Sequence, residues 1–138
     1  MKALGRHLIA EFYGCSKELL NSPEKIEQIM CSAAQRASAT IINSIFHPFQ
    51  PYGVSGVIVI AESHFAIHTW PEYKFASIDL YTCGEDVNPW IAYNYLCEIF
   101  KPQHSSIMEL KRGVIHQRNL RHKPIKTEEF LDKIGVNH

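Results

Sequence analysis

Residues 57–70 read VIVIAESHFAIHTW, and this stretch decides the fold. It is rich in residues that favour strands, and as one continuous strand it would span roughly 46 Å. That length exceeds what a sheet in a chain of 138 residues accommodates. The chain is therefore expected to turn inside the stretch. The polar trio Glu62-Ser63-His64 is the predicted position of the turn.

This predicted turn has unusual chemistry, because the trio contains no glycine, proline or Asn-Gly pair. A poor turn between two good strands is where backbone strain is expected, and strain concentrates at functional sites. The alternative is a plain tight turn with Ser63 facing solvent. Turn chemistry by itself leaves both interpretations open.

Beyond the turn, alternation places Ala66, His68 and Trp70 on one face of a strand. His68 is then either a half-buried histidine with satisfied hydrogen bonds or a base for catalysis. His64 lies four residues earlier, about 13 Å away in a strand, so the two rings are not expected to share a metal ion.

Working outward, the flanking segments alternate between strands and helices. Strands are predicted at 6–13, 40–46, 54–60, 75–83 and 105–110, and helices at 22–38 and 90–100. Ser22-Pro23 and Asn88-Pro89 are typical helix starts. The second helix is expected to turn Ile91, Tyr95 and Ile99 toward a sheet.

This order of strand, helix, several strands, helix and strand, in outline β-α-β-β-α-β, predicts an α+β fold. It is expected to be a two-layer sandwich, a mainly antiparallel sheet with two helices on one face, forming a single domain over residues 1–138. The other face of the sheet is left in need of cover, so dimerisation through it is a reasonable expectation.

Charge and cysteine content narrow the class of protein. Fourteen basic and fourteen acidic side chains cancel, which disfavours nucleic acid or an anionic membrane as partner. No signal peptide and no apolar run of 18 residues is present. Four cysteines without a CxxC pair indicate reduced thiols in the cytoplasm rather than a zinc site.

A basic stretch runs from Lys111 to Lys126. It is interpreted as a solvated C-terminal segment. The alternative is a contact with an anionic group on a partner chain.

Several motifs resemble the short prokaryotic S-adenosylmethionine decarboxylases, over residues 5 to about 100. The centre of the resemblance is ESHxxxHTWPEY followed by TCGE. The matching segments are Gly5–Tyr13, Phe46–Phe49, Gly53–Val57, Glu62–Tyr73 and Thr82–Glu85.

The resemblance implies a proenzyme that cleaves itself between Glu62 and Ser63, into a β chain of residues 1–62 and an α chain of residues 63–138. Ser63 becomes a covalent pyruvoyl group, which forms a Schiff base with S-adenosylmethionine and permits its decarboxylation. The product is an aminopropyl donor for spermidine and other polyamines. By the same resemblance His68 is the proton acceptor in processing and Cys83 the proton donor in decarboxylation.

The chemistry of these side chains agrees with the implied roles. Serine attacks an amide poorly, so a strained bond and a nearby base such as His68 both help. A thiol such as that of Cys83, with a pKa near 8.5, can donate a proton at neutral pH. Without the resemblance Cys83 would be taken for a small core residue, as Cys15, Cys31 and Cys97 are.

Substrate contacts implied by the resemblance are Phe49 on the adenine, Glu72 on the ribose and Ser55 nearby. Trp70 offers a further flat surface for a purine and a sulfonium cation. Packing roles remain open for all four. The resemblance also implies a homodimer of processed protomers with shared sites, in which Phe49 and Ser55 serve the neighbour's Ser63.

Two other functions remain open on the sequence. One is the same pyruvoyl chemistry acting on arginine or ornithine, with specificity set in the C-terminal part. The other is a ferredoxin-like ligand-binding module that keeps the motifs but performs no chemistry, and whose chain stays intact.

Overall fold

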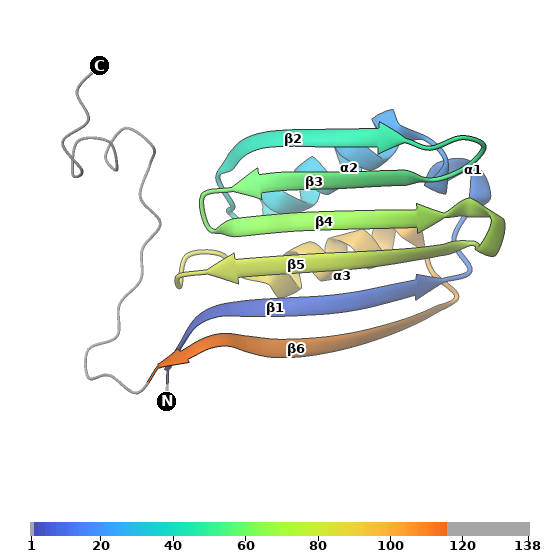
Figure 1. Cartoon of the computed structure of the whole chain (residues 1–138). Coiled ribbons are helices and arrows are strands. Elements are labelled where there is room, and N and C mark those ends of the chain that lie inside the picture. The colour runs from blue at the N-terminus through green and yellow to red at the C-terminus, as the bar shows by residue number, and fades with distance from the viewer. Residues whose placement is uncertain (1, 116–138) are drawn as a thin grey trace, which may run out of the picture.

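The computed structural model describes residues 2–115 (Figure 1). Its elements, in chain order, are β1 (Lys2–Tyr13), α1 (Lys17–Leu20), α2 (Pro23–Arg36), β2 (Ile41–Pro48), β3 (Val54–Ile60), β4 (Ser63–Trp70), the 3₁₀ turn η1 (Pro71–Tyr73), β5 (Phe75–Cys83), α3 (Pro89–Phe100) and β6 (His104–Ile115). No helix in this part of the chain is long and apolar enough to cross a membrane.

The six strands form one sheet in the order β2-β3-β4-β5-β1-β6. Every neighbouring pair is antiparallel. Helices α2 and α3 lie side by side behind the sheet, and the other face is open toward the viewer in Figure 1. The expected α+β fold, with two helices on one face of an antiparallel sheet, is confirmed.

Capping explains where the two long helices begin. The Ser22 side chain accepts a hydrogen bond from the Lys25 N–H, and Pro23 occupies the first turn of α2. Asn88 caps α3 in the same way, by accepting from the Trp90 N–H at 3.0 Å. Both starts agree with the sequence prediction.

The core lies between the helices and the sheet. The strands contribute large side chains that are fully buried, among them Leu8, Phe12, Ile58, Phe65 and Leu80. The buried side chains of α2 are Ile26, Met30, Ala33 and Ala34, on the stripe that its periodicity predicts.

The predicted core stripe of α3 is wrong. Ile91 and Ile99 are exposed, and the residues one position later, Ala92, Leu96 and Phe100, are buried instead. Apolar residues lie on several sides of this helix, so periodicity could not single out the side that packs against the sheet.

The observed strands extend beyond the predicted limits at the sheet edge. β1 begins at Lys2, and β6 continues to Ile115, so Lys111 and Arg112 belong to a strand and not to a solvated tail. The rest of the basic stretch, residues 116–126, lies outside the described residues. The short helices α1 and η1 were not predicted.

The open face carries apolar side chains that no part of the described chain covers. The strand registers place large exposed residues from five strands on this face, namely Tyr13, Ile45, Val59, Trp70, Met108 and Leu110. Large exposed apolar side chains gathered on one face are typical of interaction surfaces.

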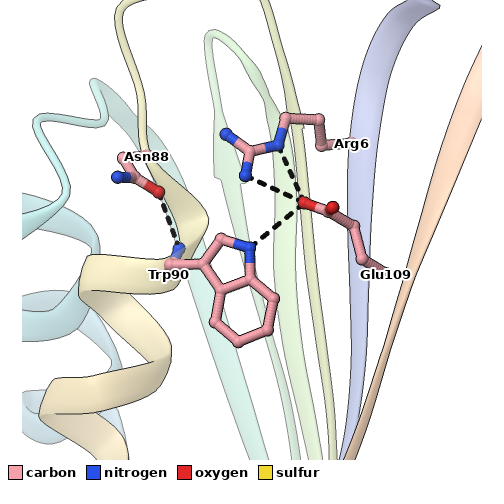
Figure 2. Close-up of polar contacts among 4 residues, drawn as sticks. All are labelled: Arg6, Asn88, Trp90 and Glu109. Atoms are coloured by element: carbon pink, nitrogen blue, oxygen red, sulfur yellow. Dashed lines mark hydrogen bonds and ion pairs between the residues drawn. The ribbon is translucent and has the colours of Figure 1, made fainter.

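On the helix side, Glu109 connects the edge strand to α3 (Figure 2). Its carboxylate accepts hydrogen bonds from Arg6 Nε at 2.9 Å and from the Trp90 indole N–H at 3.1 Å. The Arg6 guanidinium also pairs with it at 2.8 Å. These donors, Arg6 first, lower the pKa of Glu109. The carboxylate thereby ties β1, β6 and α3 together.

We predict that Glu109→Gln lowers the free energy of unfolding by roughly 1 kcal/mol at pH 7, since the bonds are charge-assisted but partly exposed to water. Because the folded-state pKa of Glu109 is lowered, its contribution is present above the unfolded pKa of about 4.3 and is lost as the pH falls. Chemical denaturation at pH 7 and at pH 3 tests both points in a Ser63→Ala background, which excludes the self-cleavage that the sequence resemblance implies.

Glu98→Gln, at an exposed position of α3, is the matched control. An effect of Glu109→Gln equal to the control at pH 7, or undiminished at pH 3, would contradict the assignment.

Candidate active site

The turn between β3 and β4 consists of Ala61 and Glu62, and Ser63 opens β4. The turn thus lies earlier than the predicted trio, and His64 is within the strand. Ser63 has a φ of 136°, a region that L-residues other than glycine rarely adopt. The strain expected from the turn's poor chemistry is therefore located at Ser63 itself.

Hydrogen bonds from two neighbouring segments fix this turn. The Cys83 N–H donates to the Glu62 carbonyl at 2.6 Å. On the opposite side, the Thr40 N–H donates to Glu62 Oε1 at 3.0 Å, and the Thr40 carbonyl accepts from the Ala61 N–H at 2.8 Å. The Glu62 side chain is buried among these groups. The Glu62 carbonyl is therefore bonded from the β5 side, while the Glu62 side chain and the Ala61 N–H are bonded from Thr40 on the other side.

Cys83, the proton donor that the sequence resemblance implies, lies at the same end of the sheet as Ser63. Its thiol and the Ser63 side chain are hydrogen-bonded, and the residue is 9% exposed. Burial raises the pKa of the Cys83 thiol, the Ser63 hydrogen bond lowers it, and the nearby Glu62 carboxylate raises it. The net direction is upward, so the thiol is protonated at neutral pH.

Thr82 lies directly opposite Ser63 in the β4–β5 register. Opposed residues normally point to the same side of a sheet, where Ser and Thr hydroxyls hydrogen-bond to one another. Here Ser63 contacts Cys83 instead, and the buried Thr82 Oγ1 has no hydrogen-bond partner among the described residues. The unusual backbone at Ser63 thus coincides with an unsatisfied hydroxyl.

His68 lies on the open face, paired with Ser55 of the adjacent strand. The distance from His68 Nδ1 to Ser55 Oγ is 2.7 Å. Five residues of extended strand separate His68 from Ser63 on β4, which corresponds to about 16 Å. Within one chain, His68 is therefore too far away to take a proton from the Ser63 hydroxyl.

The other residues expected to bind substrate lie near the end of β4 that is farther from Ser63. Trp70 ends the strand and lines an apolar hollow of about 300 Å³. Glu72, on η1, lines a cavity of about 530 Å³ together with polar residues of α1. Phe49 is exposed in the loop after β2 and makes an edge contact with His47. Within one chain, these three side chains therefore lie nearly a strand length away from Ser63.

A polar network occupies the open face between these two ends. Arg112 donates to His7 Nδ1 at 2.9 Å, and His7 Nε2 contacts Asp79 Oδ1 at 2.9 Å. The His64 ring stacks on Tyr81, and burial, followed by the charge of His7, lowers the pKa of His64. Within residues 2–115 no three His, Cys, Asp or Glu side chains gather in a way that could hold a metal ion.

Comparison with known proteins identifies the family. The family model described as S-adenosylmethionine decarboxylase matches residues 6–113. The chain belongs to the S-adenosylmethionine decarboxylase family. The resemblance seen in the sequence motifs is thereby confirmed, as is the expectation of an enzyme.

The curated relatives are bacterial and match over nearly their whole length. The S-adenosylmethionine decarboxylase proenzyme of Thermosipho africanus is 60% identical over 113 residues, which cover 82% of this chain and 87% of the relative. The proenzyme of Fervidobacterium nodosum is 53% identical over 132 residues, covering 93% and 96% respectively.

Solved structures of the family have the same fold. The adenosylmethionine decarboxylase of Aquifex aeolicus superposes with a TM-score of 0.81 at 33% identity, covering 88% of this chain and all of that one. A Trypanosoma brucei AdoMetDC monomer, 18% identical, gives a TM-score of 0.56 over 74% of this chain and 44% of its own, and supports the fold alone.

Sequence reasoning singled out side chains that lie together in the structure, but it missed the backbone groups that contact them. The structure brings Glu62, Ser63 and Cys83 together, and separately Ser55 and His68. The Thr40 peptide, which contacts the turn, carries no motif, because its role depends on backbone atoms. Only the order of strands in the sheet brings residue 40 beside residue 62.

Proposed function

We propose that this chain is the proenzyme of a pyruvoyl-dependent S-adenosylmethionine decarboxylase. In this proposal it cleaves itself between Glu62 and Ser63, and the processed enzyme forms decarboxylated S-adenosylmethionine, the aminopropyl donor for spermidine. The observation that carries the proposal is Ser63, a non-glycine residue at a φ of 136° whose hydroxyl contacts the Cys83 thiol. Four free cysteines fit a cytoplasmic enzyme.

The first step of self-cleavage is an N-to-O acyl shift. Ser63 Oγ attacks the Glu62 carbonyl carbon, and its proton passes to a histidine. The negative charge that develops on the carbonyl oxygen faces the Cys83 N–H, which already lies 2.6 Å away. The C–N bond then breaks, the Ser63 nitrogen takes a proton, and an ester replaces the amide.

The second step breaks the chain. Loss of the Ser63 α-proton drives cleavage of its Cβ–Oγ bond, so Oγ leaves as part of the new Glu62 carboxylate. Residue 63 becomes dehydroalanine, which tautomerises, takes up water and loses ammonia. The products are residues 1–62 with a carboxylate end and residues 63–138 with a ketone end.

The base for this chemistry is assigned to His68 of a second copy of the chain. His68 lies about 16 Å along β4 from its own Ser63, whereas packing two open faces with their strands antiparallel brings each His68 toward the other copy's Ser63. The exposed apolar side chains of the open face support such a dimer. Ser55 Oγ, as acceptor from Nδ1–H, leaves Nε2 free to accept a proton.

The residues around Ser63 fit a pyruvoyl group. A planar ketone carbon has no L-configured side chain, so its formation removes the strain of a positive φ. When formed, the pyruvoyl group supplies a ketone that condenses with the substrate's amine and accepts the electrons left by CO₂. The Cys83 thiol is protonated because burial raises its pKa. It would donate this proton to the carbon that loses CO₂.

Substrate binding in the dimer also draws on the second copy. Phe49, Trp70 and Glu72 lie beyond the His68 end of β4, so the packing that delivers His68 delivers them to the same site. An aromatic surface suits both the adenine and the sulfonium cation, and a carboxylate suits the ribose hydroxyls.

Self-cleavage is tested by mass. We expect the denatured wild-type protein to give two species, residues 1–62 and 63–138, the larger without a free amino terminus and reactive toward phenylhydrazine. Ser63→Ala removes the nucleophile, so it is expected to give only the intact chain. Mass spectrometry with and without phenylhydrazine is the measurement. An intact, unmodified wild-type chain would instead favour a non-catalytic binding module.

The shared site predicts complementation between two inactive variants. Ser63→Ala retains His68 but has no nucleophile, and His68→Ala retains Ser63 but lacks the base. On co-expression, mixed dimers pair the intact Ser63 of one chain with the intact His68 of the other. We expect cleavage of the His68→Ala chain only, measured by mass in a sample where neither variant is cleaved alone. Absence of cleavage in purified mixed dimers would exclude transfer between chains.

The substrate is tested by CO₂ release from S-adenosylmethionine, arginine and ornithine. We expect turnover of S-adenosylmethionine and, for Phe49→Ala and Glu72→Gln, a loss of at least about tenfold in kcat/KM, as expected when one binding contact is removed. Turnover of arginine or ornithine but not of S-adenosylmethionine would reassign the substrate while leaving the cleavage chemistry in place.

A further inference from the structure

We propose that the carboxylate of Glu62 is a positioning residue for self-cleavage: its hydrogen bond to the Thr40 N–H holds the turn in the conformation from which Ser63 attacks. The inference rests on the proposed self-cleavage and adds a role for a side chain next to the scissile bond. Glu62 thus serves twice, with its carbonyl as the reacting group and its side chain as the anchor.

Thr40, which anchors the Glu62 side chain, has a fixed position because it directly follows the capped end of α2. Ser38, just after the helix, has a left-handed φ of 67°, and the Ala39 N–H returns to the Ala34 carbonyl at 2.9 Å. This pattern of a left-handed residue and a six-residue hydrogen bond closes helices in a fixed geometry. Thr40 comes next, so its N–H and carbonyl have a defined position relative to the core.

The backbone of Thr40 forms hydrogen bonds with two adjacent residues of the turn. Its carbonyl accepts from the Ala61 N–H at 2.8 Å, and its N–H donates to Glu62 Oε1 at 3.0 Å. Thr40 therefore bonds to the side chain of Glu62, whereas the reacting Glu62 carbonyl accepts its hydrogen bond from the Cys83 N–H. Loss of this side-chain bond leaves Ala61 as the only residue of the turn held from the α2 side.

The turn needs this anchor because the uncleaved conformation is unfavourable. A positive φ at Ser63 and the unsatisfied Thr82 hydroxyl both favour relaxation of the backbone. Rotation of the Glu62–Ser63 peptide would relieve them and would move the carbonyl off the Cys83 N–H. The buried carboxylate opposes that rotation, since Glu62 is 9% exposed and its Oε1 bond has little competition from water.

The test compares two properties of the Glu62 side chain, the position of its acceptor oxygen and its negative charge. Glu62→Gln keeps an acceptor oxygen at the same distance from the backbone, whereas Glu62→Asp keeps the charge but withdraws the oxygen by one methylene. Glu62→Ala removes both. Cell-free synthesis, stopped at intervals and analysed by mass spectrometry, gives the rate of chain cleavage for each variant. Glu98→Ala, exposed on α3, is the matched control.

We expect Glu62→Ala and Glu62→Asp to cleave about 10–100-fold more slowly than wild type, the range set by loss of a buried charge-assisted hydrogen bond. Glu62→Gln is expected within about fivefold of wild type, since the amide makes the same bond without charge. A slow Gln variant with a fast Asp variant would overturn the proposal in favour of a charge effect, and wild-type rates in both Ala and Asp would overturn it outright.

Folding is checked in the Ser63→Ala background, where no variant can cleave. A cooperative thermal transition of Glu62→Asp in that background shows that slow cleavage is not due to unfolding, and the Gln–Asp comparison stands even where Glu62→Ala does not fold. Failure of the wild type to cleave would remove the proposed function itself. Normal wild-type cleavage, unaffected by Glu62→Asp, would remove only the role of the side chain.

Discussion

The backbone conformation of Ser63 is the constraint on which the site depends. A non-glycine residue at a φ of 136° costs roughly 1–3 kcal/mol. The buried Thr82 hydroxyl beside it, which has no hydrogen-bond partner within residues 2–115, adds to that cost. The cost is tolerable because β3 and β4 are central strands whose inward side chains, Ile58 and Phe65, are fully buried. The packing of these strands holds Ser63 in its strained conformation. On the proposed function, that strain favours breaking the Glu62–Ser63 peptide bond.

Strand geometry then divides the chemistry between two places. A strand cannot bend to bring His68 back to Ser63, and each residue adds about 3.3 Å between them. The nucleophile and the thiol lie at one end of β4, and the Ser55–His68 pair and the aromatic side chains lie toward the other. A rigid sheet can unite these halves only by meeting another sheet. On the proposed function, the same rigidity that strains Ser63 makes a second copy of the chain necessary for self-cleavage.

Much of this arrangement could be predicted from the sequence, because strand alternation and helix caps are local signals. The limits of β5 and the face of His68 follow from alternation, and those of β3 follow from its run of β-branched residues. The start of α2 follows from Ser22-Pro23. The side of α3 that packs inward could not be derived, since its apolar residues surround the helix. The Thr40 contact with Glu62 was equally inaccessible, because it depends on backbone atoms brought together by the β2–β3 pairing.

The open face links folding, association and chemistry. Two long helices cover one side of a six-stranded sheet, so the other side keeps exposed apolar groups such as Ile45 and Met108. In the proposed dimer, the contact that buries this face also places His68 beside the Ser63 of the other copy. A chain that has folded but not yet paired holds its strained bond without a base close enough to act. In the proposed mechanism self-cleavage therefore follows assembly, because the His68 base reaches Ser63 only from another folded copy.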